Sequence, residues 1–295
     1  MKITLYSLSI IGLSFALLTS CGGDNGDKEK LDKEVLDPNS SLNTNFDGKI
    51  FSIPSPVQTA LLIKELNLPF NQELLNPVKN SSTYSTEYRQ ALNLGIYGTD
   101  LGYAALYKQK SVSLKYLSVV EKLTGELGLE GAFDKKFMTR FEGNSDNQDS
   151  MMVIVSDAFR KADNFLKNSN RKSTSALILT GGWIESLHYA CQLNNAKSNQ
   201  KIVSRIGEQQ QTLSTIIEIL NEYNKAGSND ELIADLSSLK ESFDKVVIDY
   251  KYAAPTTNVK TKTTTLNHSI TVKIDKATLE AIAAKVNEIR EKIIK

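Results

Sequence analysis

Three residues near the middle of the chain are of types that do chemistry, and their spacing places them on one helical face. Glu185, His188 and Cys191 follow one another at intervals of three residues in the segment TGGWIESLHYAC. Side chains three or four residues apart are neighbours on an α-helix. A carboxylate, an imidazole and a thiol on one face suit a metal ion or a nucleophile beside a base. The other interpretation is that all three are ordinary core residues.

Neither chemistry is complete in this sequence. The Glu185-x-x-His188 pattern resembles half of the di-iron site of ferritin-like proteins, which needs a second such motif and two more glutamates. The only other histidine, His268, has Thr265 three residues before it. A His188–Cys191 pair would lie within one helix, and a buried lone cysteine generally behaves as an inert small hydrophobe. We therefore expect no metal and no cofactor, and keep an enzyme or metal protein centred on Glu185, His188 and Cys191 as the alternative function.

The segments that must position these residues predict an all-α fold, a multi-helix bundle. Apolar residues recur at helical spacing, and Ser55 and Pro56 mark the start of a first helix. Further helices are expected over residues 83–108, 111–126, 150–167, 173–193, 201–225 and 229–252. The β-branched, threonine-rich segment 256–274 predicts a short hairpin that turns near residues 266–268. Asp275 should cap a C-terminal helix.

A stripe of small residues runs along the helix expected at 83–108. Its glycines together cost roughly 3 kcal/mol of helix propensity relative to alanine, which close packing must offset. A matching stripe in the helix at 173–193 is the expected partner, so the two form a helix-packing seam. The seam comprises Ala91, Gly95, Gly98, Gly102 and Ala105 with Gly182, Ser186 and Ala190. The other interpretation is a ligand groove beside the bare backbone, lined by Tyr97, Tyr103, Tyr107 and Trp183.

The N-terminal residues predict a targeting segment. Lys2 precedes an apolar stretch over residues 8–18, too short to span a bilayer as a helix. The following Leu-Thr-Ser-Cys sequence, residues 18–21, resembles the lipobox of bacterial lipoproteins. That resemblance implies that residues 1–20 are a signal peptide and that Cys21 carries the acyl chains that anchor the protein. A flexible polar tether is then expected over residues 21–49, a helical bundle over 50–254, and a hairpin or linker with a C-terminal helix over 255–295.

The residues after Cys21 bear on location. By analogy with lipoprotein sorting, Gly22 in place of an aspartate favours the outer membrane. The acidic residues that follow, Asp24, Asp27 and Glu29, resemble the export tag of surface lipoproteins of Bacteroidota. The periplasmic side and the cell surface therefore both stay open.

The composition of the chain reduces the number of possible functions further. The formal net charge of +1 argues against nucleic acid as a partner, because binding it needs a basic face. The sequence contains no Walker loop, nucleophile elbow or zincin motif. We expect a lipid-anchored cell-envelope protein with a non-catalytic binding or scaffolding role toward an unknown protein or small molecule, attached to the membrane through Cys21.

Overall fold

The computed structural model of the chain describes residues 42–46, 49–53, 67–131, 135–144, 146–196 and 198–295. Over these residues it is an all-α bundle with short antiparallel strands, as the sequence predicts. The expected signal peptide, Cys21, most of the expected tether and the helix expected at Pro56 lie outside the described residues. Within these ranges, no helix combines the length and apolarity needed to cross a bilayer.

The helices follow one another along the chain, and the short strands within residues 247–273 lie between the last two. The helices are η1 (Gln72–Leu74), η2 (Val78–Ser82), α3 (Glu87–Leu106), α4 (Lys110–Glu126), α5 (Lys135–Gly143), α6 (Gln148–Asn168), α7 (Lys172–Ala196), α8 (Gln200–Glu222), η3 (Lys225–Gly227), α9 (Asp230–Phe243) and α10 (Lys276–Ile294).

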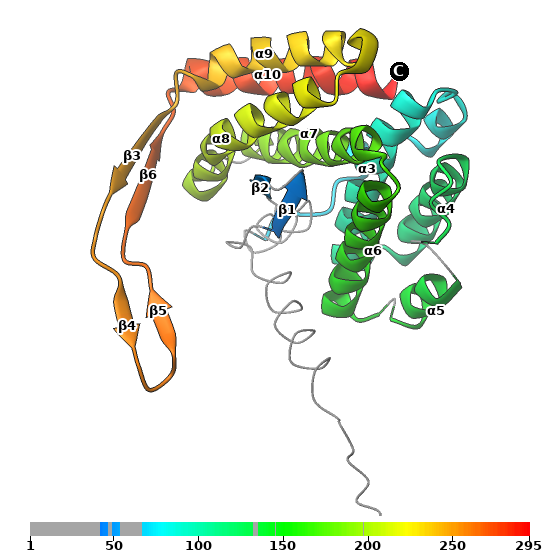
Figure 1. Cartoon of the computed structure of the whole chain (residues 1–295), viewed down its shortest axis with the longest axis horizontal. Helices are drawn as coiled ribbons and strands as arrows, with labels where there is room; N and C mark the ends of the chain where they lie inside the picture. The colour runs from blue at the N-terminus through cyan, green and yellow to red at the C-terminus, as the bar shows by residue number, and fades with distance from the viewer. Residues whose placement is uncertain (1–41, 47–48, 54–66, 132–134, 145, 197) are drawn as a thin grey trace, which may run out of the picture.

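Helices α3 and α7 form the centre of the bundle and make the most extensive contact in it. Every residue of α3 from Ala91 to Leu106 is buried, as expected of a helix that is apolar all round. Around this pair, α4 and α6 pack against α3, while α8 and α10 pack against α7. Helix α9 lies beside α10 on the outside (Figure 1). The central pair is therefore closed off from solvent on several sides.

Polar caps fix where several helices begin. The side chain of Thr86 accepts a hydrogen bond from the backbone N–H of Arg89 at the start of α3, 3.3 Å away. Asp275 caps α10 in the same way, 2.9 Å from the N–H of Thr278, as the sequence predicts. Each cap satisfies one of the backbone donors that a helix leaves free in its first turn.

The predicted hairpin is longer than expected and turns elsewhere. Strand β3 (Val247–Lys251) pairs with β6 (Ser269–Lys273), and β4 (Thr256–Asn258) pairs with β5 (Thr263–Thr265), both antiparallel. The turn thus lies at residues 259–262, where the side chain of Asn258 accepts hydrogen bonds from the backbone N–H groups of Lys260 and Thr261. We call residues 247–273 the ribbon; Figure 1 shows it projecting away from the helices.

The prediction of a helix over residues 229–252 is therefore wrong beyond residue 243. Helix α9 ends at Phe243, and β3 begins four residues later. Ile248, Tyr250 and Tyr252 alternate with Asp249 and Lys251, which is the period-two pattern of a strand. Because Val246 and Val247 directly precede these residues, the alternation is hard to recognise in the sequence.

The expected domain boundaries also shift. Strand β1 (Leu42–Phe46) lies within the expected tether and pairs with β2 (Lys49–Ile53), which extends past the expected end of the tether at residue 49. Phe46 is buried in the main core and its ring lies 5.9 Å from that of Tyr223. Helix α10 packs against α7 and α9, so it belongs to the bundle and does not form a separate C-terminal unit.

Candidate functional site

The central feature of the buried core is an ion pair between Glu185 and Arg290. The Nε and Nη2 of Arg290 donate to the two carboxylate oxygens of Glu185 at 2.5 and 2.7 Å. Nη2 also donates to the backbone carbonyl of Leu74 at 2.9 Å. Glu185 is 0% exposed. Its carboxylate is thus occupied by a two-pronged guanidinium contact, which is the strongest common form of ion pair.

A second carboxyl group, that of Asp100, lies in the same buried cluster. The hydroxyl of Tyr189 donates to Asp100, and the backbone N–H of Asn76 donates to its other oxygen at 3.1 Å. Burial, followed by the charge of Glu185, raises the pKa of Asp100 well above its usual range. A raised pKa favours the neutral acid, which hydrogen bonds to Glu185. The cluster therefore holds two carboxyl groups and one guanidinium, close to charge balance.

Side-chain amides extend this cluster to the C-terminal end of α10. The amide of Asn76 donates to the hydroxyl of Tyr84 and to the side-chain oxygen of Asn93. Tyr84 in turn donates to the carbonyl of Ile294 at 3.1 Å, and Asn93 donates to that of Ile293 at 3.0 Å. These bonds satisfy carbonyls that a helix end leaves free. The network thereby fixes α3 and α10 relative to each other.

His188 and Cys191 are buried beside this cluster. Burial, with the nearby charge of Arg290, lowers the pKa of His188 to about 3. In the described part of the chain, His188 Nδ1 has no hydrogen-bond partner. Burial raises the pKa of the Cys191 thiol to about 12. At neutral pH the first is a neutral imidazole and the second a protonated thiol, so the pair lacks an activated nucleophile.

The three residues on one face therefore do not assemble a site. Glu185 faces Arg290, and both His188 and Cys191 are packed in the core. Among the residues that the structure describes, no group of three or more His, Cys, Asp or Glu side chains is placed to hold a metal ion.

The small residues of α3 approach α7 at its glycines. A Cβ atom built on Gly95 would lie 2.0 Å from the carbonyl oxygen of Ile178 and 2.6 Å from the nitrogen of Gly182. One on Gly181 would lie 1.9 Å from the carbonyl oxygen of Leu92. Both are backbone collisions, so these glycines permit the close approach of the two helices. Gly181 was not among the expected seam residues.

The rest of the expected stripe divides between two helices. A Cβ atom on Gly98 would meet the ring of Phe159 on α6 at 1.7 Å, and one on Gly102 would lie 3.8 Å from Met152 of the same helix. Gly98 and Gly102 thus face α6 and not α7, because a stripe that wraps around a central helix meets more than one neighbour. The other expected seam residues are all buried: Ala91, Ala105, Ser186 and Ala190.

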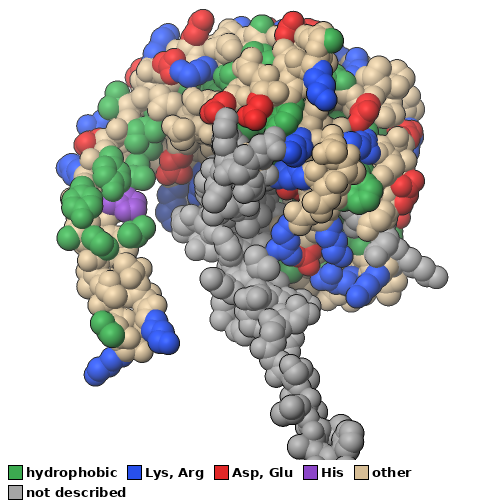
Figure 2. Space-filling view, in the orientation of Figure 1, with side chains coloured by type: hydrophobic (Ala, Val, Ile, Leu, Met, Phe, Trp, Pro, Cys, Tyr) green, Lys and Arg blue, Asp and Glu red, His purple; other side chains and the backbone are tan. Residues whose placement is uncertain are grey.

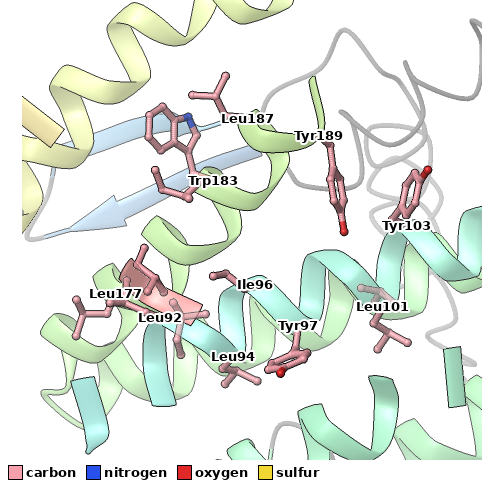
Figure 3. Packing of buried hydrophobic residues seen from close by; sticks show 14 of the residues in the cluster. Leu92, Leu94, Ile96, Tyr97, Leu101, Tyr103, Leu177, Trp183, Leu187 and Tyr189 are labelled. Carbon is pink, nitrogen blue, oxygen red and sulfur yellow. The ribbon is translucent and has the colours of Figure 1, made fainter. Parts of the chain in front are cut away.

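Of the four aromatic residues proposed for a ligand groove, only Tyr103 and Tyr107 are in ring contact, with their centroids 5.0 Å apart. The hydroxyls of Tyr97 and Tyr107 donate to backbone carbonyls 2.9 and 2.6 Å away. Trp183 faces α8, where its indole N–H donates to Gln209 at 2.9 Å. Tyr103 packs against the ring of Tyr189, away from Trp183 (Figure 3). The four do not line one groove, because Tyr103 and Tyr107 pack on Phe70 whereas Trp183 packs toward α8.

Exposed apolar residues gather instead on the ribbon. The register pairs Ile248 with Val272 and Tyr250 with Ile270, so all four lie on one face because side chains alternate along a strand. Val272 is 4% exposed and packs on α8 near Gly207, whereas Tyr250 is 55% exposed. The apolar face thus begins in the core and continues into solvent.

Exposure increases toward the tip of the ribbon. Tyr252 is 73% exposed, and Val259 in the turn is 82% exposed. Leu266 is also exposed, in the connection between β5 and β6. Figure 2 shows hydrophobic side chains along the ribbon and lysines at its tip. The asparagine side chain at position 267 donates to the carbonyl of Ala254 and to Thr256, which holds the outer strands together.

Arg290, Asp100 and the apolar face of the ribbon were not predicted as site residues from the sequence. Asp100 is the only charged residue between positions 91 and 106, and Glu185 is the only one between 175 and 196. A single acid in each of two apolar helices is a signal that both are buried and must share a counter-charge. That signal points to a basic residue, although it does not identify Arg290.

Comparisons with known proteins do not assign this fold to a family: no family model matches the chain, and no curated protein or solved structure is significantly similar to it.

Proposed function

We propose that this chain is a lipid-anchored protein of the bacterial outer membrane with a binding or scaffolding role and no catalytic one. In this proposal Cys21 carries the acyl chains, and the helical bundle is a rigid support for the ribbon. The observation that carries the binding role is the ribbon itself, which projects from the bundle with its apolar face in solvent (Figures 1 and 2).

The ribbon has the physical properties of an interaction element. A two-stranded hairpin alone is marginally stable in water, and both of its long edges carry backbone groups that can pair with another strand. Contiguous exposed apolar residues on a protein surface commonly mark a binding site. In the ribbon these features coincide, while its base is held by Val272 in the core.

The alternative function, an enzyme around Glu185, His188 and Cys191, has no supporting observation. The carboxylate of Glu185 is neutralised by Arg290. The pKa of His188 is lowered and that of Cys191 is raised, so both side chains are uncharged at neutral pH. A paired carboxylate, a neutral imidazole and a protonated thiol, all buried, supply neither a charged base nor an activated nucleophile.

In-cell photocrosslinking tests the proposed role of the ribbon. A photoreactive amino acid replaces Tyr252 in the ribbon or, as the matched control, Phe165 on α6, which is 44% exposed. After illumination of intact cells, we expect covalent adducts with an envelope protein or lipid from position 252 and none from position 165. Equal adducts at both positions, or none at position 252, would contradict the proposal.

The anchor is tested separately by Cys21→Ala. The variant should no longer incorporate labelled palmitate and should leave the membrane fraction. Labelling that persists in the variant would show that Cys21 is not the acylated residue.

A further inference from the structure

We propose that the tip of the ribbon contacts an anionic phospholipid bilayer, the same membrane that holds the acyl chains. This inference rests on the proposed function, because it names the partner of the ribbon in a lipid-anchored protein. Three features carry it: the charge of the ribbon, the residues at its tip, and the position of strand β1 on the side of the bundle toward which the ribbon extends.

The ribbon is basic although the chain is nearly neutral. Residues 247–273 contain four lysines and one aspartate, which gives +3, while the full chain carries +1. The remaining residues therefore carry −2 in total. Such a concentration of positive charge favours an anionic partner. It disfavours a second copy of the ribbon, because two surfaces of like charge repel each other.

The tip combines an apolar side chain with flanking cations. Val259, at 82% exposure, lies in the turn beside the exposed residues Lys260 and Lys262. Tyr252 and Leu266 add exposed apolar surface further up the ribbon. Soluble domains attach to anionic bilayers by inserting apolar side chains into the headgroup region. Their lysine ammonium groups stay among the phosphates.

The geometry of the chain allows the anchor and the tip to meet one membrane. Strand β1, where the described chain begins, lies on the side of the bundle toward which the ribbon extends (Figure 1). At about 3.3 Å per residue, the stretch from Val247 to Val259 can reach at most roughly 40 Å. The chain from Cys21 to Leu42 can span up to about 70 Å, which is enough for the tip to touch the bilayer while the bundle stands above it.

Vesicle sedimentation of unlipidated protein tests this inference. The Cys21→Ala protein is mixed with vesicles of phosphatidylglycerol in phosphatidylcholine, or of phosphatidylcholine alone. We expect binding to the first only, weakened by raised salt. Loss of both tip charges in Lys260→Gln/Lys262→Gln should weaken it about 30-fold, at roughly fivefold per lysine. Val259→Ser should also weaken binding.

The matched control is Lys110→Gln/Lys115→Gln, which removes the same charge from exposed positions on α4. This control should bind as tightly as the parent protein, and the circular dichroism of all variants should be unchanged. An equal loss in the control, or no binding to the anionic vesicles, would overturn the inference. If vesicle binding is absent while position 252 still crosslinks to a protein or to a second copy, the binding role stands and the lipid partner is wrong.

Discussion

The centre of the bundle and the ribbon use their residues in opposite ways. The centre contains the chemically versatile side chains, Asp100, Glu185, His188 and Cys191, and encloses all of them. The ribbon contains threonines, lysines and a few apolar residues, and exposes them. Reactive residue types are therefore a poor guide to function here, because burial and partners decide what a side chain can do. The following predictions test how far this contrast holds.

The largest expected effect comes from removing the buried guanidinium. Arg290→Met keeps most of the side-chain volume but leaves the buried carboxylate of Glu185 without its counter-charge. We expect the free energy of unfolding, measured by urea denaturation, to fall by about 3–5 kcal/mol. The control is Lys292→Met on the same helix, which removes an exposed pair with Asp235 and should leave the midpoint nearly unchanged. A similar loss in both variants would show that the buried cluster does not hold the bundle together.

The glycines of the central helices should give the next largest effect. In Gly95→Ala the new methyl group meets the backbone of α7, which cannot rotate aside. We expect a loss of about 1–3 kcal/mol, despite a gain of about 1 kcal/mol in helix propensity. Gly98→Ala should cost less, because the ring of Phe159 can move. Gly125→Ala on α4, with no neighbouring atom within 4 Å, should instead stabilise the protein. Denaturation midpoints in the order Gly125, Gly98, Gly95, from highest to lowest, would support this reasoning, and any other order would contradict it.

A pH-dependent effect should follow from the buried imidazole. The pKa of His188 is about 3 in the folded protein and about 6.5 when unfolded. Below pH 6.5 the unfolded chain binds a proton that the folded chain does not, so stability falls as the pH falls toward 3. The expected contribution at pH 5 is a loss of about 2 kcal/mol relative to pH 7. The difference in unfolding free energy between pH 7 and pH 5 should therefore be smaller in His188→Leu than in the parent protein. An unchanged difference would place the imidazole in contact with water.

The smallest expected effect concerns the ribbon. Tyr252→Ser and Leu266→Ser remove exposed apolar side chains that no core residue covers, so each should change the free energy of unfolding by less than about 0.5 kcal/mol. Chemical denaturation of each variant measures this directly. A loss of several kcal/mol would mean that the ribbon packs on the bundle, and the contrast between the two regions would fail.

The sequence predicts the bundle better than it predicts the site. Helical spacing and caps such as Asp275 are local signals, so α3, α7 and α10 appear close to their expected positions. The strand at residues 247–251 is missed because β-branched and aromatic residues follow a helix without a break. Glu185 and Arg290 are 105 positions apart in the sequence. No local sequence pattern predicts a contact between residues so far apart. The exposure of the ribbon depends on which elements leave it uncovered, which only the assembled fold determines.

The long separation between Glu185 and Arg290 also sets an order of events during synthesis. At about 5–20 residues per second, the guanidinium emerges from the ribosome roughly 5–20 s after the carboxylate that it neutralises. Until then, closing α3 against α7 would bury the carboxylate of Glu185 without a cation, which is costly. We therefore expect the core around Asp100 and Glu185 to close only after α10 has been made.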